Sequence, residues 1–414
     1  MSVKIKADIR HWLRELDKKY FFVMLGFAVM VYFPLISLKL TNTVDGLWTT
    51  AEYMAGAWEL SNGRWFWLVT SFLRFSLQLE PINAVVCLVL VSLGVTRLHM
   101  LFKPAWMRTS CIDWLAGLCY VSNVVVGCYL SFHFIAPEYG FSFFFAMLAT
   151  EHVIRGKSAV SSIVPAAVLL ALSLGLYQTN LACFCLVLPM MCTVFMVATS
   201  QALFYIPMSG GLALFLPVCF WLLDSSREGK TACDAFRKCW NKAEKALILL
   251  TAAAVVYGSV FMSAVDQQAM YEGRQATKEL SDLIAQTLVN EGYYDNEIPV
   301  MLVGNASNSP LFRTHELYHT ANPYARVGLF MAETAGTIRF SWDAAFRDYT
   351  PIWLNLCDDK TYQKLLETEE IAEMPTFPQE GSIRKMDGVL VIKVSEEYHL
   401  DADWKNKMMS GEYD

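Results

Sequence analysis

Charged side chains are rare in the first two thirds of this chain, so the few in its loops are candidates for chemistry. Asp45 follows the first long apolar run and lies in the loop 39–80. A carboxylate held there could act as a general base and take a proton from a hydroxyl group. An aspartate before a glycine is also common in an ordinary turn, and this alternative stays open.

More charged residues follow in the same loop. Glu52 and Glu59 are seven residues apart, so on a helix they share one face. Glu52 also completes the capping-box pattern Thr49-x-x-Glu52, and Glu59 could simply be solvated. Arg64 could hold a phosphate by charge-assisted hydrogen bonds, or it could snorkel or pair with Glu59.

Two later loops place polar groups next to apolar segments. The stretch SFHFIAPEYG carries His133, Glu138 and Tyr139. Tyr177 and Gln178 end another apolar run. Polar groups at such a depth need a partner or a polar ligand. His133 is interpreted first as an interfacial aromatic residue rather than as a catalyst.

The cysteines and histidines do not have the spacing of a metal or disulfide framework. Most of the eleven cysteines lie inside apolar runs, where they act as small hydrophobic residues. We therefore predict no zinc site, no disulfide framework and no cofactor. The sequence also gives no support for a divalent metal ion.

These candidate residues are positioned by a chain that crosses a bilayer several times. Of 414 residues, 55% are hydrophobic and only 17% are charged, with a mean hydropathy of +0.35. A soluble domain is usually about 25% charged. The apolar runs are long enough to cross about 30 Å of hydrocarbon. Expected spans are 20–38, 81–98, 111–131, 139–154, 159–177, 179–199, 202–222 and 246–264.

Basic residues set the expected orientation in the membrane. Positive charges flank the first span and fill the loops after the second and fourth spans, so the N-terminus and these loops should be cytoplasmic. Eight simple spans would place the basic stretch 224–245 outside. We favour a cytoplasmic basic loop and an external tail, with a broken or re-entrant segment within 179–223 as the explanation.

The expected architecture is an all-α polytopic membrane domain with a small C-terminal α/β soluble domain. Residues 1–265 form the first domain, with about seven to eight spans, and 266–414 form an extracytoplasmic domain. Two surface helices are expected in the outer loop, one from Thr49 to Asn62-Gly63 and one from Arg64 to Leu79. The tail predicts helices at 274–290 and 360–370 and strands at 299–303 and 389–394.

The motif VDGLW followed by GAWELSNGRW resembles the start of the bacterial type II glucosyltransferases, which include serotype-converting O-antigen glucosyltransferases. The family's acidic residue falls on Asp45, and its Trp-x-x-x-x-Gly-Arg pattern falls on Trp58 and Arg64. SLGLYQ, ending at Gln178, and the tail segments VGNASNSPLF, ANPYARVGLF and PQEGSIRKMDGVLVIKV are similar too. Many members have paired aspartates where this chain has Val44-Asp45, and longer members have more spans, so the chain resembles a shortened member.

The resemblance implies a GT-C fold and the transfer of a hexose, expected to be glucose, from a polyprenyl-phosphate carrier to a cell-surface polysaccharide at the outer face. Asp45 would be catalytic and Arg64 would face the donor phosphate. Expected partners are the bilayer, the lipid-linked sugar, the polysaccharide, a donor-synthesising enzyme and a flippase. No basic stripe indicates nucleic acid. The other substrate-binding residues expected are Glu52, Trp58, Glu59, Glu138, Tyr139, Tyr177 and Gln178.

Two alternative functions stay open. A lipid-sugar flippase or transporter subunit would need charged residues along its spans, and these hold few besides Glu151 and His152 near an inner end. A membrane-anchored glycan-binding protein would use the external tail without catalysing transfer.

Overall fold

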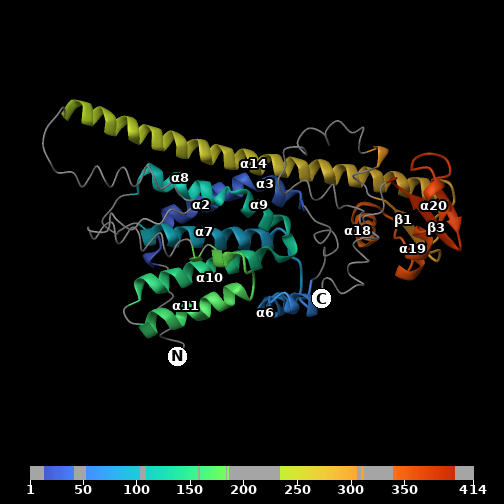
Figure 1. Ribbon diagram of the computed structural model, residues 1–414, viewed down its shortest axis with the longest axis horizontal. Helices are drawn as coiled ribbons and strands as arrows, with labels where there is room; N and C mark the ends of the chain where they lie inside the picture. Colours follow the sequence, from blue (N-terminus) through green and yellow to red (C-terminus); the bar gives the residue numbers. More distant parts are fainter. Residues whose placement is uncertain are drawn as a thin grey trace.

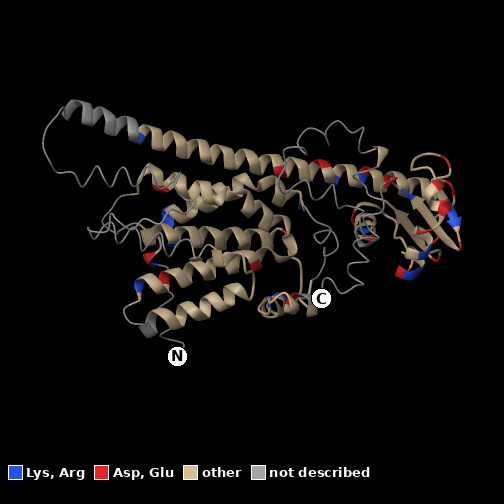
Figure 2. Cartoon of the chain, viewed as in Figure 1, with Lys and Arg blue, Asp and Glu red and all other residues tan. Residues whose placement is uncertain are grey.

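The computed structural model describes residues 14–41, 53–102, 109–156, 159–182, 184–185, 234–304, 309–311 and 339–396. It is mostly helical: a bundle of apolar helices is joined by one very long helix to a small domain that contains a sheet (Figure 1). Charged side chains are sparse along the bundle helices and frequent in the small domain (Figure 2).

The bundle is built from apolar helices with defined starts. Asp17 begins the first of them by accepting a hydrogen bond from the backbone N of Tyr20. Ser110 and Asp113 form the capping box that begins another. The bundle contains α2 (Lys18–Val31), α3 (Phe33–Ser37), α7 (Ile82–Phe102), α8 (Cys111–Val121), α9 (Val124–Ser131), η1 (His133–Ile135), α10 (Ala136–Arg155) and α11 (Ala159–Leu174).

Helix α10 packs between α7 and α11 (Figure 1). A Cβ on Gly140 would meet the backbone of Cys87 at 3.0 Å, so the absence of a side chain there lets α10 approach α7 closely. On the other side of α10, the hydroxyl of Ser142 donates to the carbonyl of Ser173 at 2.9 Å. These contacts set the position of α10 along the axes of α7 and α11.

The long helix α14 (Asp234–Asn290) runs along α8 and α2 and continues into the small domain (Figure 1). Ser263 Oγ donates to the carbonyl of Ser122 at 2.8 Å, and Gln267 Nε2 donates to that of Val31 at 3.0 Å. Farther along, Arg274 Nη1 donates to the carbonyl of Leu38 at 2.6 Å. Because its contacts advance in the same order from Val31 at the end of α2 to Leu38 after α3, α14 runs in the same direction as these two helices.

Three helices in the described part of the chain are long and apolar enough to cross a membrane: Ile82–Phe102, Cys111–Ser131 and Lys245–Asn290. The second consists of α8 and α9, which meet at a break where Asn123 caps α9. These helices agree with a helical membrane domain. The expected spans 179–199 and 202–222 fall mainly outside the described residues.

The small domain has a three-stranded sheet in the order β1-β3-β2, with β1 parallel and β2 antiparallel to β3. The C-terminal half of α14 packs on this sheet, so Leu280, Ile284 and Leu288 share a core with Leu302 and Ile392. The elements are β1 (Val300–Val303), β2 (Ile383–Met386), β3 (Val389–Lys393), α18 (Arg339–Tyr349), α19 (Asp359–Leu366) and α20 (Glu369–Glu373).

Several expected elements are confirmed. Strands β1 and β3 match the apolar runs 299–303 and 389–394, and α19 covers most of the expected helical stretch 360–370. Helix α20 lies mostly beyond that stretch. Strand β2 was not expected, although Asp387 and Gly388, with φ of 47° and 81°, form the kind of tight turn that joins two strands.

The surface helices differ from the expectation. Helix α5 (Ala57–Ser61) ends before Gly63, whose φ of 73° is the left-handed conformation of a helix end, as predicted. The predicted helix from Thr49 is wrong in extent: residues 53–56 are not helical, and α5 begins only at Ala57. The expectation that Glu52 and Glu59 share one helix face is therefore wrong too. The predicted helix Arg64–Leu79 is wrong in extent: α6 covers only Trp67–Leu73, because Phe75 and Ser76 take left-handed φ of 55° and 58°.

The expected tail helix 274–290 is not a separate element. It is the end of α14, which continues unbroken through the expected domain boundary at 265/266. Polarity changes there, but nothing in the local sequence breaks a helix, since no proline or glycine lies between Gly258 and Gly273. The boundary itself stays a prediction.

Lys393 in β3 is fully buried, and its substitution should loosen the small domain. Its Nζ donates to the carbonyls of Ala372 at 3.0 Å and Met374 at 2.7 Å and pairs with Glu396 at 2.8 Å. Lys393→Met would leave the two carbonyls without this donor, a cost of about 3 kcal/mol. In the full chain in detergent, amides of α20 should then exchange hydrogen about 100-fold faster.

The matched control is Lys364→Met. Lys364 pairs with Asp387 at 3.0 Å, but both side chains are exposed, so the loss should be below about 1 kcal/mol. Equal exchange rates in the two variants would show that the buried lysine contributes no more than the exposed one.

Candidate functional site

Three segments that are distant in sequence meet at one end of the bundle. The backbone N of Phe66 donates to the carbonyl of Gly175 at 2.8 Å, which ties the start of α6 to the turn after α11. Gln178 Nε2 donates to the carbonyl of Asn62 at 2.6 Å. Arg74 Nη1 donates to the carbonyl of Phe134 at 2.7 Å and so joins the end of α6 to the segment before α10. Most of the candidate residues expected from the sequence belong to these segments.

Arg64 is held between two aromatic rings. Its guanidinium carbon lies 4.8 Å from the ring centre of Trp67 and 5.4 Å from that of Tyr177. The Nε of Arg64 and the Nε1 of Trp67 are both buried and donate no hydrogen bond. Among the described residues no carboxylate pairs with Arg64, so the expected alternative of a pair with Glu59 is wrong. A cation with a buried, unused donor, beside a second unused donor on Trp67, is suited to bind an oxyanion.

Glu59 has partners within the chain. Its carboxylate is buried and accepts hydrogen bonds from the hydroxyl of Tyr53 and from the backbone N of Gly56, the latter at 2.6 Å. These bonds hold the segment before α5 against that helix. The solvated alternative is therefore wrong, and a role of Glu59 in substrate binding stays a prediction.

The expected aromatic and amide residues lie close together. Tyr139 is buried, stacks on Tyr129 at 4.8 Å and meets Tyr177 edge-on at 4.7 Å. Gln178 is exposed at its tie to the α5 end. Glu138 is almost completely buried and faces Arg74, with 2.9 Å between Oε1 and Nη2.

Asp45 and Glu52 lie outside the described residues, and so does the side chain of Trp58, whose backbone belongs to α5. The residues that flank the loop are described. Thr41 Oγ1 donates to the carbonyl of Ser131 at 2.8 Å, and the backbone N of Tyr53 donates to that of Ser76 at 2.7 Å. Both anchors are at the same end of the bundle as Arg64.

Sequence reasoning missed Arg74, Gln78 and Glu80, which follow α6. Each has buried side-chain N or O atoms that make no hydrogen bond. Their signal was weak: in TSFLRFSLQLEP, polar side chains are interleaved with apolar ones and fit a surface helix equally well. His133, interpreted as an interfacial aromatic, is buried, and its carbonyl accepts from Asn83 Nδ2 at 3.2 Å.

Burial raises the pKa of Glu80, just before α7, to about 7, and the nearby Lys39 opposes this rise. The folded state therefore holds the proton more tightly than the unfolded state. The sign follows from linkage: this stabilisation is complete below pH about 4.5 and is lost as pH rises through about 7. Glu80→Gln removes the charged form, so above pH 7.5 the variant should melt at a higher temperature than the parent protein. At pH 4.5 the two should melt together.

Thermal unfolding in detergent from pH 4.5 to 8 measures this difference. Asp358→Asn is the control for the loss of a carboxylate. Hydrogen bonds from Thr361 lower the pKa of the exposed Asp358 carboxyl, so this variant should not gain stability at high pH. Melting curves of the Glu80 variant and the parent that stay parallel at all pH values would contradict the assignment.

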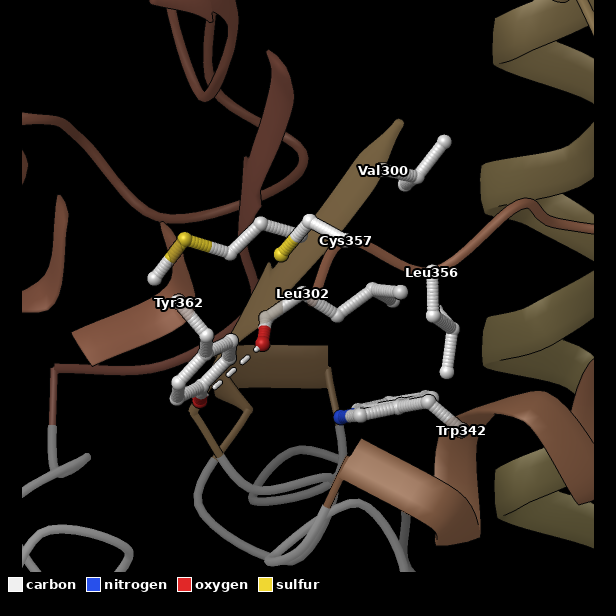
Figure 3. A pocket seen from close by; sticks show the side chains of 7 residues that line it. Val300, Leu302, Trp342, Leu356, Cys357 and Tyr362 are labelled. Atoms are coloured by element: carbon white, nitrogen blue, oxygen red, sulfur yellow. Dashed lines mark hydrogen bonds between the residues drawn. The ribbon is translucent and has the colours of Figure 1, made fainter. Parts of the chain in front are cut away.

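The small domain has two pockets, and neither is as good a candidate ligand site as the end of the bundle that holds Arg64. One is lined by Val300, Leu302, Trp342, Leu356, Cys357 and Tyr362 (Figure 3). Its free volume of about 10 Å³ is the space of a single water molecule. A second, of about 370 Å³, lies beside Asp358 and Thr361, whose polar groups bond to each other at the start of α19. Neither presents an unused buried donor.

Comparisons with known proteins add one match. A family model described as Glucosyl transferase GtrII matches residues 39–300, more than half of the chain. No curated protein and no solved structure gives a significant match. The matched range contains every residue of the candidate site and the whole of α14.

Proposed function

Because this chain belongs to the GtrII glucosyl transferase family, we propose that it transfers glucose from a polyprenyl-phosphate carrier to a polysaccharide at the outer face of the bacterial membrane. Family membership gives glucosyl transfer, and the apolar helices fit a membrane enzyme. The lipid donor, the acceptor and a GT-C arrangement are the proposed part.

The observation that carries the lipid-phosphate donor is the setting of Arg64. The bond that breaks joins the anomeric carbon to a phosphate oxygen, and the phosphate leaves with the electron pair. Negative charge therefore grows on that oxygen in the transition state. A guanidinium with an unused buried Nε, held between Trp67 and Tyr177, is suited to stabilise that charge.

The outer-face location is supported by the basic residues at the other end of the bundle. Arg155 Nη2 donates to the carbonyl of Met100 at 3.1 Å, and the backbone N of Asp17 lies 3.5 Å from the sulfur of Met100. The starts of α2 and the ends of α7 and α10 therefore meet there, with Lys18, Lys19 and Arg97. The positive-inside rule makes this the cytoplasmic end. Nucleotide sugars are cytoplasmic, so a site at the opposite end needs a lipid-carried donor.

The direction of α14 supports an extracytoplasmic small domain. Since α14 runs parallel to α2, its start is at the proposed cytoplasmic end and its C-terminal half is at the outer end. The basic stretch 224–245 would then be cytoplasmic, as the distribution of charge favours. The described residues on either side of 186–233 lie at opposite ends of the bundle, which fits this orientation.

We assign Asp45 the role of general base. It would take the proton of the acceptor hydroxyl as that oxygen bonds to the anomeric carbon. Thr41, which is anchored to Ser131, precedes it by four residues, a reach of about 14 Å at full extension. Asp45 can therefore reach the end of the bundle that holds Arg64.

The proposed function is tested with the full chain in proteoliposomes that contain polyprenyl-phosphate-[14C]glucose and an added polysaccharide from a deletion strain. Radioactivity should enter the polysaccharide, and the deletion strain should lack a branch glucose in glycan analysis. Movement of the carrier across the vesicle without any transfer would instead establish the flippase alternative. Binding of glycan with no turnover would establish the glycan-binding alternative.

A further inference from the structure

Two buried Arg–Glu pairs attach neighbouring segments to α10, one at each end. At the proposed inner end, Arg97 Nε donates to Glu151 Oε2 at 2.8 Å, and a second bond joins Nη2 to Oε1. Arg155 adds a third contact to Glu151 at 3.1 Å. This bidentate arrangement uses both carboxylate oxygens, which is the geometry expected of a structural ion pair.

The Arg74–Glu138 pair at the outer end does not form such a bidentate contact. Arg74 Nη2 lies 2.9 Å from Glu138 Oε1, and Nη1 is used by the carbonyl of Phe134. However, this contact lacks the geometry of a well-formed hydrogen bond, and Arg74 Nε has no acceptor. Besides Arg74, Thr70 is the side chain that interacts with the Glu138 carboxyl. Glu138 is 1% exposed and Arg74 15%. Each buried polar group left without a hydrogen bond is unfavourable, so packing alone gives no reason for this geometry.

More unused polar atoms belong to the same segment. Both amide atoms of Gln78 and the hydroxyl of Ser71 are buried without a hydrogen bond. The segment 74–83 is tied at both ends to the residues just before α10, by Arg74 to Phe134 and by Asn83 to His133. The segment that carries Gln78 is therefore held against the residues just before α10.

Aromatic rings stand beside this group. The ring of Tyr53 contacts Phe134 with 4.8 Å between centres and Trp67 with 6.2 Å. The ring of Trp67 also contacts the guanidinium group of Arg64. Arg64 precedes α6 and Arg74 follows it, so this short helix connects the proposed phosphate site to the polar group.

The chemistry of this group matches a neutral polyhydroxyl ligand. A carboxylate, a guanidinium and an amide offer acceptors and donors with no net charge, and each hydroxyl of a hexose both donates and accepts. A phosphate fits less well, because Glu138 would repel it, whereas no carboxylate in the described part of the chain pairs with Arg64. We propose that Arg74, Glu138 and Gln78 bind the hydroxyl groups of the hexose that is transferred; this rests on the proposed function.

The test compares Glu138→Gln with Glu151→Gln, which breaks the other buried Arg–Glu pair of α10. Transfer is measured in proteoliposomes with polyprenyl-phosphate glucose and with its 2-, 3-, 4- and 6-deoxy analogues. Glu138→Gln should lower kcat/KM for glucose about 100-fold, while for one deoxy donor the parent protein and the variant should react alike. Glu151→Gln should keep the donor preference of the parent protein.

Arg74→Lys is the second variant, because it keeps the ion pair but loses the planar fork. It should fold like the parent protein and also lose preference between glucose and a deoxy donor. If Glu138→Gln and Arg74→Lys lower all donors by the same factor, as Glu151→Gln would, the pair is structural and the inference is wrong. If the parent protein transfers no glucose from any lipid donor, the proposed function fails instead.

Discussion

Asp45→Asn is expected to lower the rate of glucosyl transfer about 10³-fold while the protein still inserts into the membrane. The amide has nearly the same shape but cannot take the proton of the acceptor hydroxyl, and a positioned general base contributes about 10²- to 10⁴-fold. The measurement is kcat/KM with polyprenyl-phosphate glucose and acceptor in proteoliposomes. Asp45→Glu should retain part of the activity, because the carboxylate is kept.

The matched control is Asp17→Asn at the opposite end of the bundle. Asp17 caps α2 through the backbone N of Tyr20, so this variant loses a carboxylate without touching the site. It should transfer at the parental rate. Full activity of Asp45→Asn would show that another group accepts the proton. Labelling of a cysteine at position 45 only from the cytoplasmic side would refute the proposed orientation.

Arg64→Ala should also have a large effect, a loss of about 100-fold in kcat/KM for the lipid donor. Most of the loss should appear in kcat, because the charge on the phosphate increases in the transition state. Arg64→Lys should lose about 10-fold: it keeps the charge but neither the fork nor the stacking between Trp67 and Tyr177.

Arg155→Ala is the control for the loss of a positive charge. Arg155 is partly exposed at the proposed cytoplasmic end, where it contacts Glu151 and Met100. Its substitution should leave kcat and KM within about twofold of the parent protein. Equal kinetics of the Arg64 and Arg155 variants would remove the phosphate role from Arg64.

The local parts of the fold could be predicted from the sequence. Long apolar runs indicated the bundle helices, and short apolar runs indicated β1 and β3. The Asn62-Gly63 pair marked a helix end, which Gly63 confirms with its positive φ. The order of the short motifs indicated the family. These signals succeed because each depends on a few neighbouring residues.

The arrangement of the site could not be predicted in the same way. Arg74 meets Glu138 across 64 positions of sequence, and Arg64 lies between one ring from its own segment and one from the turn after α11. Such contacts depend on tertiary packing. Glu59 shows the same limit: its sequence position fits a solvated helix face, but Tyr53 and Gly56 turn its carboxylate inward.

The continuity of α14 also has a mechanical consequence. Its segment Lys245–Asn290 has 46 residues and rises about 69 Å, more than twice the thickness of the hydrocarbon layer. Met270 belongs to the core of the bundle and Leu280 to that of the small domain, so one rod is clamped in both. The position and rotation of the small domain relative to the bundle are therefore set by this one helix. One extra residue between the clamps would turn it by about 100° around the rod.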